Sequence, residues 1–242
     1  AFVTNNSFLT PLTTTPSLQR AHNKAQNGWT VNVQPDNFNE VVSVSKSLTF
    51  DAVPSDSISV KGLAMVGTTV PVAKLTLADP FTVTDTLRLE SVLGGKVFIG
   101  DNNFFVNAAA VSTGGQDSSY IVTNGAGNLV KRGIGSQAFR FNVGTTSSFA
   151  PLGFADNNNT PDNFSVKVTG KSNAANFDPS LPPQAAAFVK FQWEICEDVT
   201  GGSNAQLIFD WRDNIENVFG VASELNVVGR STGTEWVPRV IP

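Results

Sequence analysis

The chain has 242 residues, of which 40% are hydrophobic and 15% charged, and its net charge at pH 7 is −4. This length allows one large all-β domain or two of ordinary size, and the acidic balance excludes the basic surface of a nucleic-acid-binding protein. One histidine, His22, and one cysteine, Cys196, exclude an intrachain disulfide and a Cys/His zinc cluster, and they leave only His22 as a base for Ser-His-Asp catalysis.

Residues 1–28 are predicted to form an extended N-terminal arm. Pro11 and Pro16 flank a run of threonines, which disfavours both a helix and a central strand. Four apolar residues precede the first proline. They either dock on the sheet of their own chain, the more common outcome for a terminus, or add a donor strand to a neighbouring subunit. These residues are Phe2, Val3, Phe8 and Leu9.

Residues 29–125 are predicted to form a β-rich domain. Short segments that alternate apolar and polar residues are typical of strands with one buried face, and turn-forming Pro, Gly and Asp residues separate them. We see no helical periodicity of any length in the chain, and only short helical turns near 108–110 and 213–218 are candidates. The alternating segments are 30–33, 42–44, 48–50, 57–60, 75–77, 81–83, 87–89 and 97–99.

Residues 126–242 continue the same pattern with longer strands. Alternation is clear at 139–143, 164–168, 188–195 and 206–211, and a long proline-containing loop covers 170–187. Several strands at this spacing favour an antiparallel β-sandwich, of the jelly-roll or immunoglobulin-like kind. The sequence therefore predicts an all-β fold of one or two antiparallel sandwiches preceded by an extended arm.

A resemblance to a known group enters at residues 90–242. The segments 93–100, 120–129 and 139–152 resemble recurring sequence lines of secreted Bacteroidetes proteins. In that group they belong to the β-sandwich module of large cell-surface adhesins and gliding-associated proteins. Two positions depart from the pattern, since Asn142 replaces the usual proline and Phe149 the usual tyrosine. The resemblance implies an extracellular location at the cell surface.

The same resemblance implies glycosylation. Ser57 and Thr86 lie in Asp-Ser/Thr-aliphatic triplets, which are similar to the O-glycosylation site of Bacteroidetes glycoproteins. Asn163 matches the N-glycan acceptor pattern.

Carboxylates supply the candidates for chemistry. Asp156 and Asp162 flank an Asn-rich loop whose oxygens suit calcium, although a plain polar turn is the commoner interpretation. Glu194 and Asp210 could form the carboxylate pair of a glycosidase, but solvated carboxylates are ordinary on strand edges. We expect no catalytic residues and no cofactor other than this weak calcium candidate.

Exposed tryptophans are the candidates for ligand binding. Trp29 and Trp236 could stack on a glycan, whereas Trp193 and Trp211 lie on apolar strand faces typical of a core. Cys196 follows Ile195 in a predicted strand and is expected to be a small packing residue.

These observations favour a non-enzymatic, secreted structural subunit that self-assembles into an extracellular filament, sheath or surface layer. We expect strand addition between subunits, with the four apolar residues of the arm at the interface and copies of the same chain as partners. The alternative is a surface adhesin or carbohydrate-binding module that contacts glycans or other surface proteins. No apolar run reaches the roughly 18 residues of a membrane-spanning helix, so we expect no membrane insertion. The chain begins at Ala1, as either a processed mature product or a piece of a larger protein.

Overall fold

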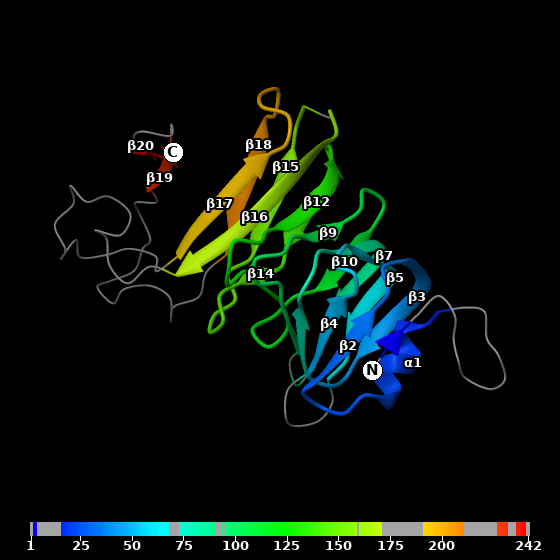
Figure 1. Cartoon of the computed structure of the whole chain (residues 1–242). Helices are drawn as coiled ribbons and strands as arrows, with labels where there is room; N and C mark the ends of the chain where they lie inside the picture. The colour runs from blue at the N-terminus through cyan, green and yellow to red at the C-terminus, as the bar shows by residue number, and fades with distance from the viewer. Residues whose placement is uncertain are drawn as a thin grey trace. The chain divides into compact units, whose positions relative to one another are not determined.

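The computed structural model describes residues 2–3, 16–67, 73–90, 93, 95–158, 160–170, 191–210, 227–231 and 236–240 (Figure 1). For 2–3, 227–231 and 236–240 only the backbone is described. The chain divides into two compact units, one made of Ala1–Thr169 with Trp193–Asp210 and the other of Gly170–Gln192 with Trp211–Pro242.

Most of the first unit is a parallel β-solenoid of about five turns. Each turn adds one strand to each of two sheets. The first sheet is parallel throughout. Its order is β1 (Phe2–Val3), β2 (Trp29–Val33), β4 (Leu48–Ala52), β6 (Ala73–Leu77), β8 (Gly95–Phe98), β11 (Ile121–Val122) and β14 (Val143–Gly144).

The second sheet begins with parallel strands and ends with antiparallel ones. Its parallel strands are β3 (Asn37–Val44), β5 (Ile58–Met65), β7 (Phe81–Leu89), β9 (Phe104–Val106) and β12 (Leu129–Ile134), and β10 (Val111–Gly114) also pairs with β7. β16 (Asp162–Gly170) then pairs antiparallel with β12, and β17 (Phe191–Glu197) follows at the edge.

Two smaller sheets complete the described strands. β13 (Phe139–Phe141), β15 (Leu152–Asp156) and β18 (Ala205–Phe209) form an antiparallel sheet in the order β13-β15-β18. In the second unit, β19 (Val227–Ser231) and β20 (Trp236–Val240) form an antiparallel pair.

The expected antiparallel sandwich, jelly-roll or immunoglobulin-like, is therefore wrong, although the prediction of an all-β chain holds apart from one short helix. Successive strands of the solenoid mostly alternate between the two sheets, so most strands pair in parallel with a strand two or three places further along the chain. The Pro, Gly and Asp residues between strands form corners of the coil rather than hairpins. Both kinds of connection use the same turn-forming residues.

The core consists of columns of apolar side chains that stack from one turn to the next. One column joins Leu48, Leu75, Val97, Ile121 and Val143, all buried and each in register with the next. In the second sheet, the stacked rings of Phe81 and Phe104 lie 5.6 Å apart, and the ring of Phe50, on β4 of the first sheet, lies 6.3 Å from that of Phe81. Each fully buried side chain of this size contributes about 1.5–3 kcal/mol to folding, so stacked columns hold the turns together.

One helix, α1 (Leu18–Lys24), lies within the segment for which an extended arm was expected. Ser17 is its N-cap, and the Ser17 hydroxyl accepts a hydrogen bond from the Arg20 amide. The helix lies against β2 and β3 (Figure 1), and its buried residues are Leu18, Ala21 and His22. No helix was expected at these residues, which was wrong, because seven residues carry the helical spacing only once and the helix is stabilised mainly by tertiary contacts.

Candidate functional site

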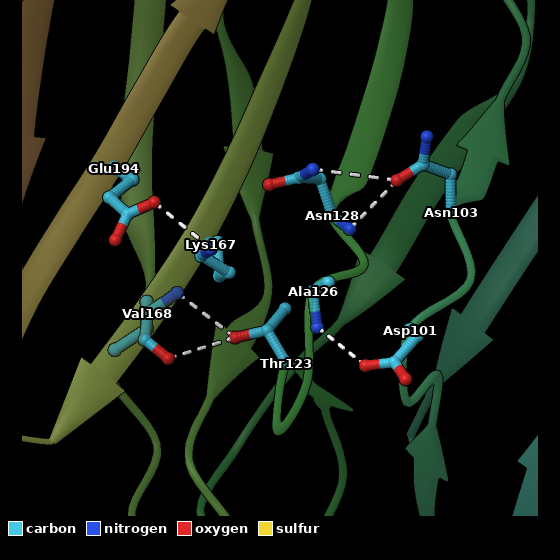
Figure 2. Close-up of polar contacts among 8 residues, drawn as sticks. All are labelled: Asp101, Asn103, Thr123, Ala126, Asn128, Lys167, Val168 and Glu194. Atoms are coloured by element: carbon cyan, nitrogen blue, oxygen red, sulfur yellow. Dashed lines mark hydrogen bonds and ion pairs between the residues drawn. The ribbon is translucent and has the colours of Figure 1, made fainter.

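Polar residues at the corners of the coil are bonded to the next turn. Figure 2 shows Asp101 Oδ1 accepting from the Ala126 amide at 2.8 Å and Asn103 Oδ1 accepting from the Asn128 amide at 2.9 Å. These side chains satisfy backbone donors that the corner would otherwise leave unpaired. Their role is therefore structural.

A second polar contact joins the two sheets where the parallel turns end. The buried hydroxyl of Thr123 accepts from the Val168 amide at 2.9 Å and donates to the Val168 carbonyl at 3.1 Å (Figure 2). One side chain thus bonds both backbone groups of a residue on β16, as a neighbouring strand would.

Lys131 occupies a core column of the second sheet. It is in register with Val106 and is only 5% exposed. Its ammonium group donates to the carbonyls of Asn107, Ala108 and Ala110 at 2.5, 2.8 and 3.1 Å. Burial lowers the pKa of Lys131. The lysine holds a turn of backbone in place and is not available to a substrate.

Tyr120 and Lys96 form a similar buried contact. The Lys96 ammonium donates to the Tyr120 hydroxyl at 2.7 Å, and that hydroxyl donates to the Thr145 carbonyl at 2.8 Å. Burial, with a smaller contribution from the Asp117 charge, raises the pKa of Tyr120 to about 12. Burial lowers the pKa of Lys96, and the Asp117 charge acts in the opposite direction.

The calcium candidates organise loops. Asp156 is 1% exposed, and its Oδ1 accepts from the amides of Asn158 at 3.1 Å and Asn204 at 2.8 Å. Asp162 accepts from the amides of Asn163 and Val199. In the part of the chain that the structure describes, no group of three or more His, Cys, Asp or Glu side chains is arranged to hold a metal ion. Calcium binding by Asp156 and Asp162 therefore stays a prediction.

The two carboxylates considered for glycoside hydrolysis belong to separate ion pairs. Glu194 pairs with Lys167 and Asp210 with Arg140, each at 3.0 Å. Each carboxylate thus has its own cation, Lys167 on the neighbouring strand β16 and Arg140 on β13, which is an ordinary surface arrangement.

The edge of β3 is covered by side chains of α1. Gln19 Oε1 accepts from the Ser43 amide at 2.6 Å, and Gln19 Nε2 donates to the Ser43 carbonyl at 3.3 Å. The next amide beyond the strand, that of Ser45, donates to His22 Nε2 at 3.1 Å. Because Gln19 and His22 lie three residues apart, they share one face of the helix and together take the place of a neighbouring strand.

The hydrogen bond from Ser45 fixes the state of His22. A backbone amide can only donate, so Nε2 must be the acceptor and the ring proton must lie on Nδ1, where Asn23 Oδ1 accepts it at 3.2 Å. His22 is 2% exposed, and burial is the main cause that lowers its pKa. The Asn23 hydrogen bond opposes this shift, and the Lys46 charge adds to it.

Two charged residues hold the ends of the helix. Glu40, on β3, accepts from the Ser17 hydroxyl at 2.8 Å and from the Leu18 amide at 2.5 Å. Lys46 donates to the carbonyls of His22, Asn23 and Ala25 at 3.1, 3.0 and 2.9 Å. A carboxylate at the N-terminus and an ammonium group at the C-terminus both complement the helix dipole.

The edge of the other sheet is partly covered by the arm. Phe2 and Val3 form β1, which pairs in parallel with Asn32 and Val33 of their own chain. Phe8 and Leu9 lie outside the described residues. Trp29, at the start of β2 and beyond this pairing, is 45% exposed.

The strands at the far end of the first unit carry apolar groups that are less well covered. Trp193 on β17 and Phe209 on β18 contact each other edge to face at 5.0 Å, yet both are only half-buried. Ile208, on the opposite face of β18, is 62% exposed. Among the described residues, β17 and β18 each have a paired strand on one side only.

The remaining predicted positions are scattered. The side chain of Trp236 is not described, although its backbone begins β20. Ser57 and Thr86 are half-buried, on β5's N-terminal side and within β7. Cys196 is free and exposed, so the expectation of a packing residue was wrong.

Sequence reasoning missed the contacts that place α1 on β3, those of Gln19, Glu40 and Lys46, and it considered His22 only as a catalytic base. A signal was present: Ser17 is a favoured N-cap, and Leu18, Ala21, His22 and Ala25 recur with helical spacing. Glu40 and Lys46 are far from the helix in sequence, so no local pattern links them to it.

Comparison of the chain with protein family models, with curated proteins and with solved structures yields no match. Within the described residues, no helix is long and apolar enough to cross a membrane.

Proposed function

We propose that this chain is a non-enzymatic structural subunit of an extracellular filament, sheath or surface layer, and that it assembles with copies of itself by strand addition. The observation that carries the proposal is the difference between the ends of the first unit. Side chains of α1 cover the edge of β3, whereas the edge strand β18 presents an exposed isoleucine.

Unlike ends favour head-to-tail growth. A contact between two different surfaces is heterologous and need not close, so it can extend into a fibre. A strand that joins an edge gains backbone hydrogen bonds, and its apolar side chains set the register. Side chains of α1 bond the C-terminal end of the β3 edge, whereas β18 has a paired strand on one side only among the described residues, and this difference favours addition at β18.

Residues 1–12 are the proposed donor. The part of this arm that is described already adopts a strand, and it covers only Asn32 and Val33 of the five-residue strand β2. Leaving so short a pairing costs little, and exchange of such a segment between identical subunits is a known route to assembly. The apolar side chains of the donor would then lie against the edge strand of the neighbouring subunit. These side chains are those of Phe2, Val3, Phe8 and Leu9.

Three lysines that bond backbone carbonyls support a structural role. Lys46 and Lys131 each donate to three backbone carbonyls, and Lys96 donates to Tyr120 and the Thr146 carbonyl. The ammonium groups of these three lysines thus form hydrogen bonds within the chain, most of them to its backbone. The low charge and the resemblance to secreted surface proteins support the extracellular location.

Deletion of residues 1–12 tests the proposal. We expect the full chain to form regular polymers in negative-stain microscopy and light scattering, and the shortened chain to remain folded and monomeric. The matched control is T13S/T14S/T15S, which changes the linker and keeps the apolar residues and should polymerise normally. Normal polymers of the shortened chain would contradict the proposal.

The exposed Trp29 keeps a second function in view, that of a carbohydrate-binding adhesin. It follows Gly28, whose φ of 82° turns the chain at the start of β2. This alternative predicts monomers whose tryptophan fluorescence changes on glycan addition and a Trp29→Ala variant that loses this response.

A further inference from the structure

The helix α1 covers β3 through a contact that requires an uncharged histidine. The Ser45 amide donates to His22 Nε2, and the helix has its other direct edge contact through Gln19. We propose that α1 is an acid-sensitive latch, which lies on the edge of β3 while His22 is neutral and leaves that edge when His22 is protonated.

The chemistry follows from the hydrogen-bonding roles. With the ring proton on Nδ1, protonation adds a proton to Nε2, the atom that accepts from Ser45. Two N–H groups then face each other, so the hydrogen bond is lost and the amide is left without its acceptor. The new positive charge also sits where the ring is 2% exposed, and a buried charge without a counter-ion is costly.

The surrounding charges add to this effect. The nearest cation is Lys46, which bonds the His22 carbonyl itself. On the helix, Arg20 and Lys24 are also cationic, and β1 and β2 contribute no titratable side chain. Glu40 is the single carboxylate described in contact with α1, and its contacts are with Ser17, Leu18 and Gln19 at the far end of the helix.

The sign of the pH effect is set by burial. Since burial lowers the pKa of His22 from its ordinary value near 6.5, the ring stays neutral at pH 7 and the latch stays closed. Between the ordinary value near 6.5 and the lowered folded-state pKa, each unit by which the pH falls raises the open fraction by up to about tenfold, and below the folded-state pKa the rise levels off.

Opening the latch would uncover the C-terminal end of the edge of β3, at Ser43 and Ser45. Such an edge accepts a strand from another chain. The identity of this partner as a second copy of the chain rests on the proposed function. The latch itself does not depend on the proposed function.

Hydrogen exchange read by NMR on the monomeric chain tests the latch. The amides of Ser43 and Ser45 are followed from pH 7.5 to pH 5, with rates corrected for the intrinsic pH dependence of exchange. Because His22 is the sole histidine, its ring signals report its titration without ambiguity. We expect the ring to titrate below pH 6.5, and the protection of both amides to fall by up to about tenfold per pH unit between pH 6.5 and that midpoint.

Two variants separate His22 from other groups. In His22→Gln the side-chain carbonyl can still accept from Ser45 but does not titrate, so protection should stay constant over the range. Glu40→Gln weakens the contacts at the N-terminus of the helix, so protection should fall by the same factor at every pH while its dependence on pH stays that of the wild type. Constant protection in the wild type, or an equal loss in His22→Gln, would overturn the latch. Should His22→Gln not fold, coincidence of the wild-type ring titration with loss of Ser45 protection decides, and a titration without that loss overturns the latch. The measurement uses monomers, so its result is independent of assembly.

Discussion

The parallel turns and the antiparallel far end of the first unit differ in how well their apolar side chains are buried and their strand edges covered. In the turns, buried residues stack in columns, and α1 bonds to the edge of β3. At the far end, Trp193 and Phe209 are half-buried and Ile208 is exposed. The comparison teaches that the stacked turns supply a continuous buried core, whereas β17 and β18 leave apolar side chains partly or largely exposed.

The largest difference should appear when an aromatic side chain is removed from each region. Phe81→Ala deletes a fully buried ring that stacks on Phe50 and Phe104, and we expect a loss of about 3–5 kcal/mol in the free energy of unfolding. Phe209→Ala deletes a half-buried ring and should cost about 1 kcal/mol. Urea unfolding measures both. Equal losses would remove the distinction between the two regions.

A lysine pair sharpens the same comparison. Lys131→Met leaves three backbone carbonyls without their donor, so we expect a loss of about 2–3 kcal/mol. Lys167→Met removes a partly exposed ion pair with Glu194 and should cost less than about 1 kcal/mol. Thermal and urea unfolding of both variants provide the measurement, and a larger loss for Lys167→Met would contradict the account.

Alkaline pH probes the Tyr120 contact. The folded-state pKa is raised to about 12, above the ordinary value of 10, so the neutral phenol is favoured by folding. This contribution is complete below pH 10 and is lost as pH rises from 10 to about 12, by at most about 1.4 kcal/mol per pH unit. Tyr120→Phe should abolish this component in unfolding measured at pH 9, 10 and 11. The same slope in Tyr120→Phe would assign the effect to other groups.

The smallest effect on stability is expected at the exposed edge. Ile208→Lys changes a 62% exposed side chain and should alter the free energy of unfolding by less than about 0.5 kcal/mol. A lysine on an edge strand disfavours pairing with another chain, so polymers should become short or absent in light scattering. Val111→Lys, at a 58% exposed position on β10, is the matched control and should leave polymers unchanged.

The positions of many strands were predicted correctly from the sequence, but the predicted antiparallel pairing of these strands was wrong. The segments 30–33, 48–50 and 75–77 all lie in strands, because alternation reports a buried and an exposed face in any sheet. Alternation does not report the direction of the neighbour, and residues such as Pro54 or Asp79 form a corner as readily as a hairpin.

The parallel pairing left a different signal. Apolar residues in register, such as Leu75, Val97 and Ile121, recur at intervals of roughly 20–30 residues, which is typical of solenoids. Recognising this repeat would have predicted the coil.

The candidate site was less predictable. His22 was considered as a catalytic base, but its Nε2 accepts a hydrogen bond from the Ser45 amide. Ser45 is 23 residues further along the chain. Lys131 has the sequence appearance of a surface lysine, and its burial depends on the three carbonyls that the folded turn presents. Contacts of this kind arise from the stacking of turns, which no local pattern encodes.

The most direct test of strand addition is backbone hydrogen exchange in the monomer and in the polymer. The account predicts that the β3 amides at Ser43 and Ser45 are protected at pH 7.5 in both states. It predicts that outward-facing amides of β18 exchange rapidly in the monomer and become protected in the polymer. Polymers in which β18 exchanges as fast as it does in the monomer would contradict strand addition at that edge.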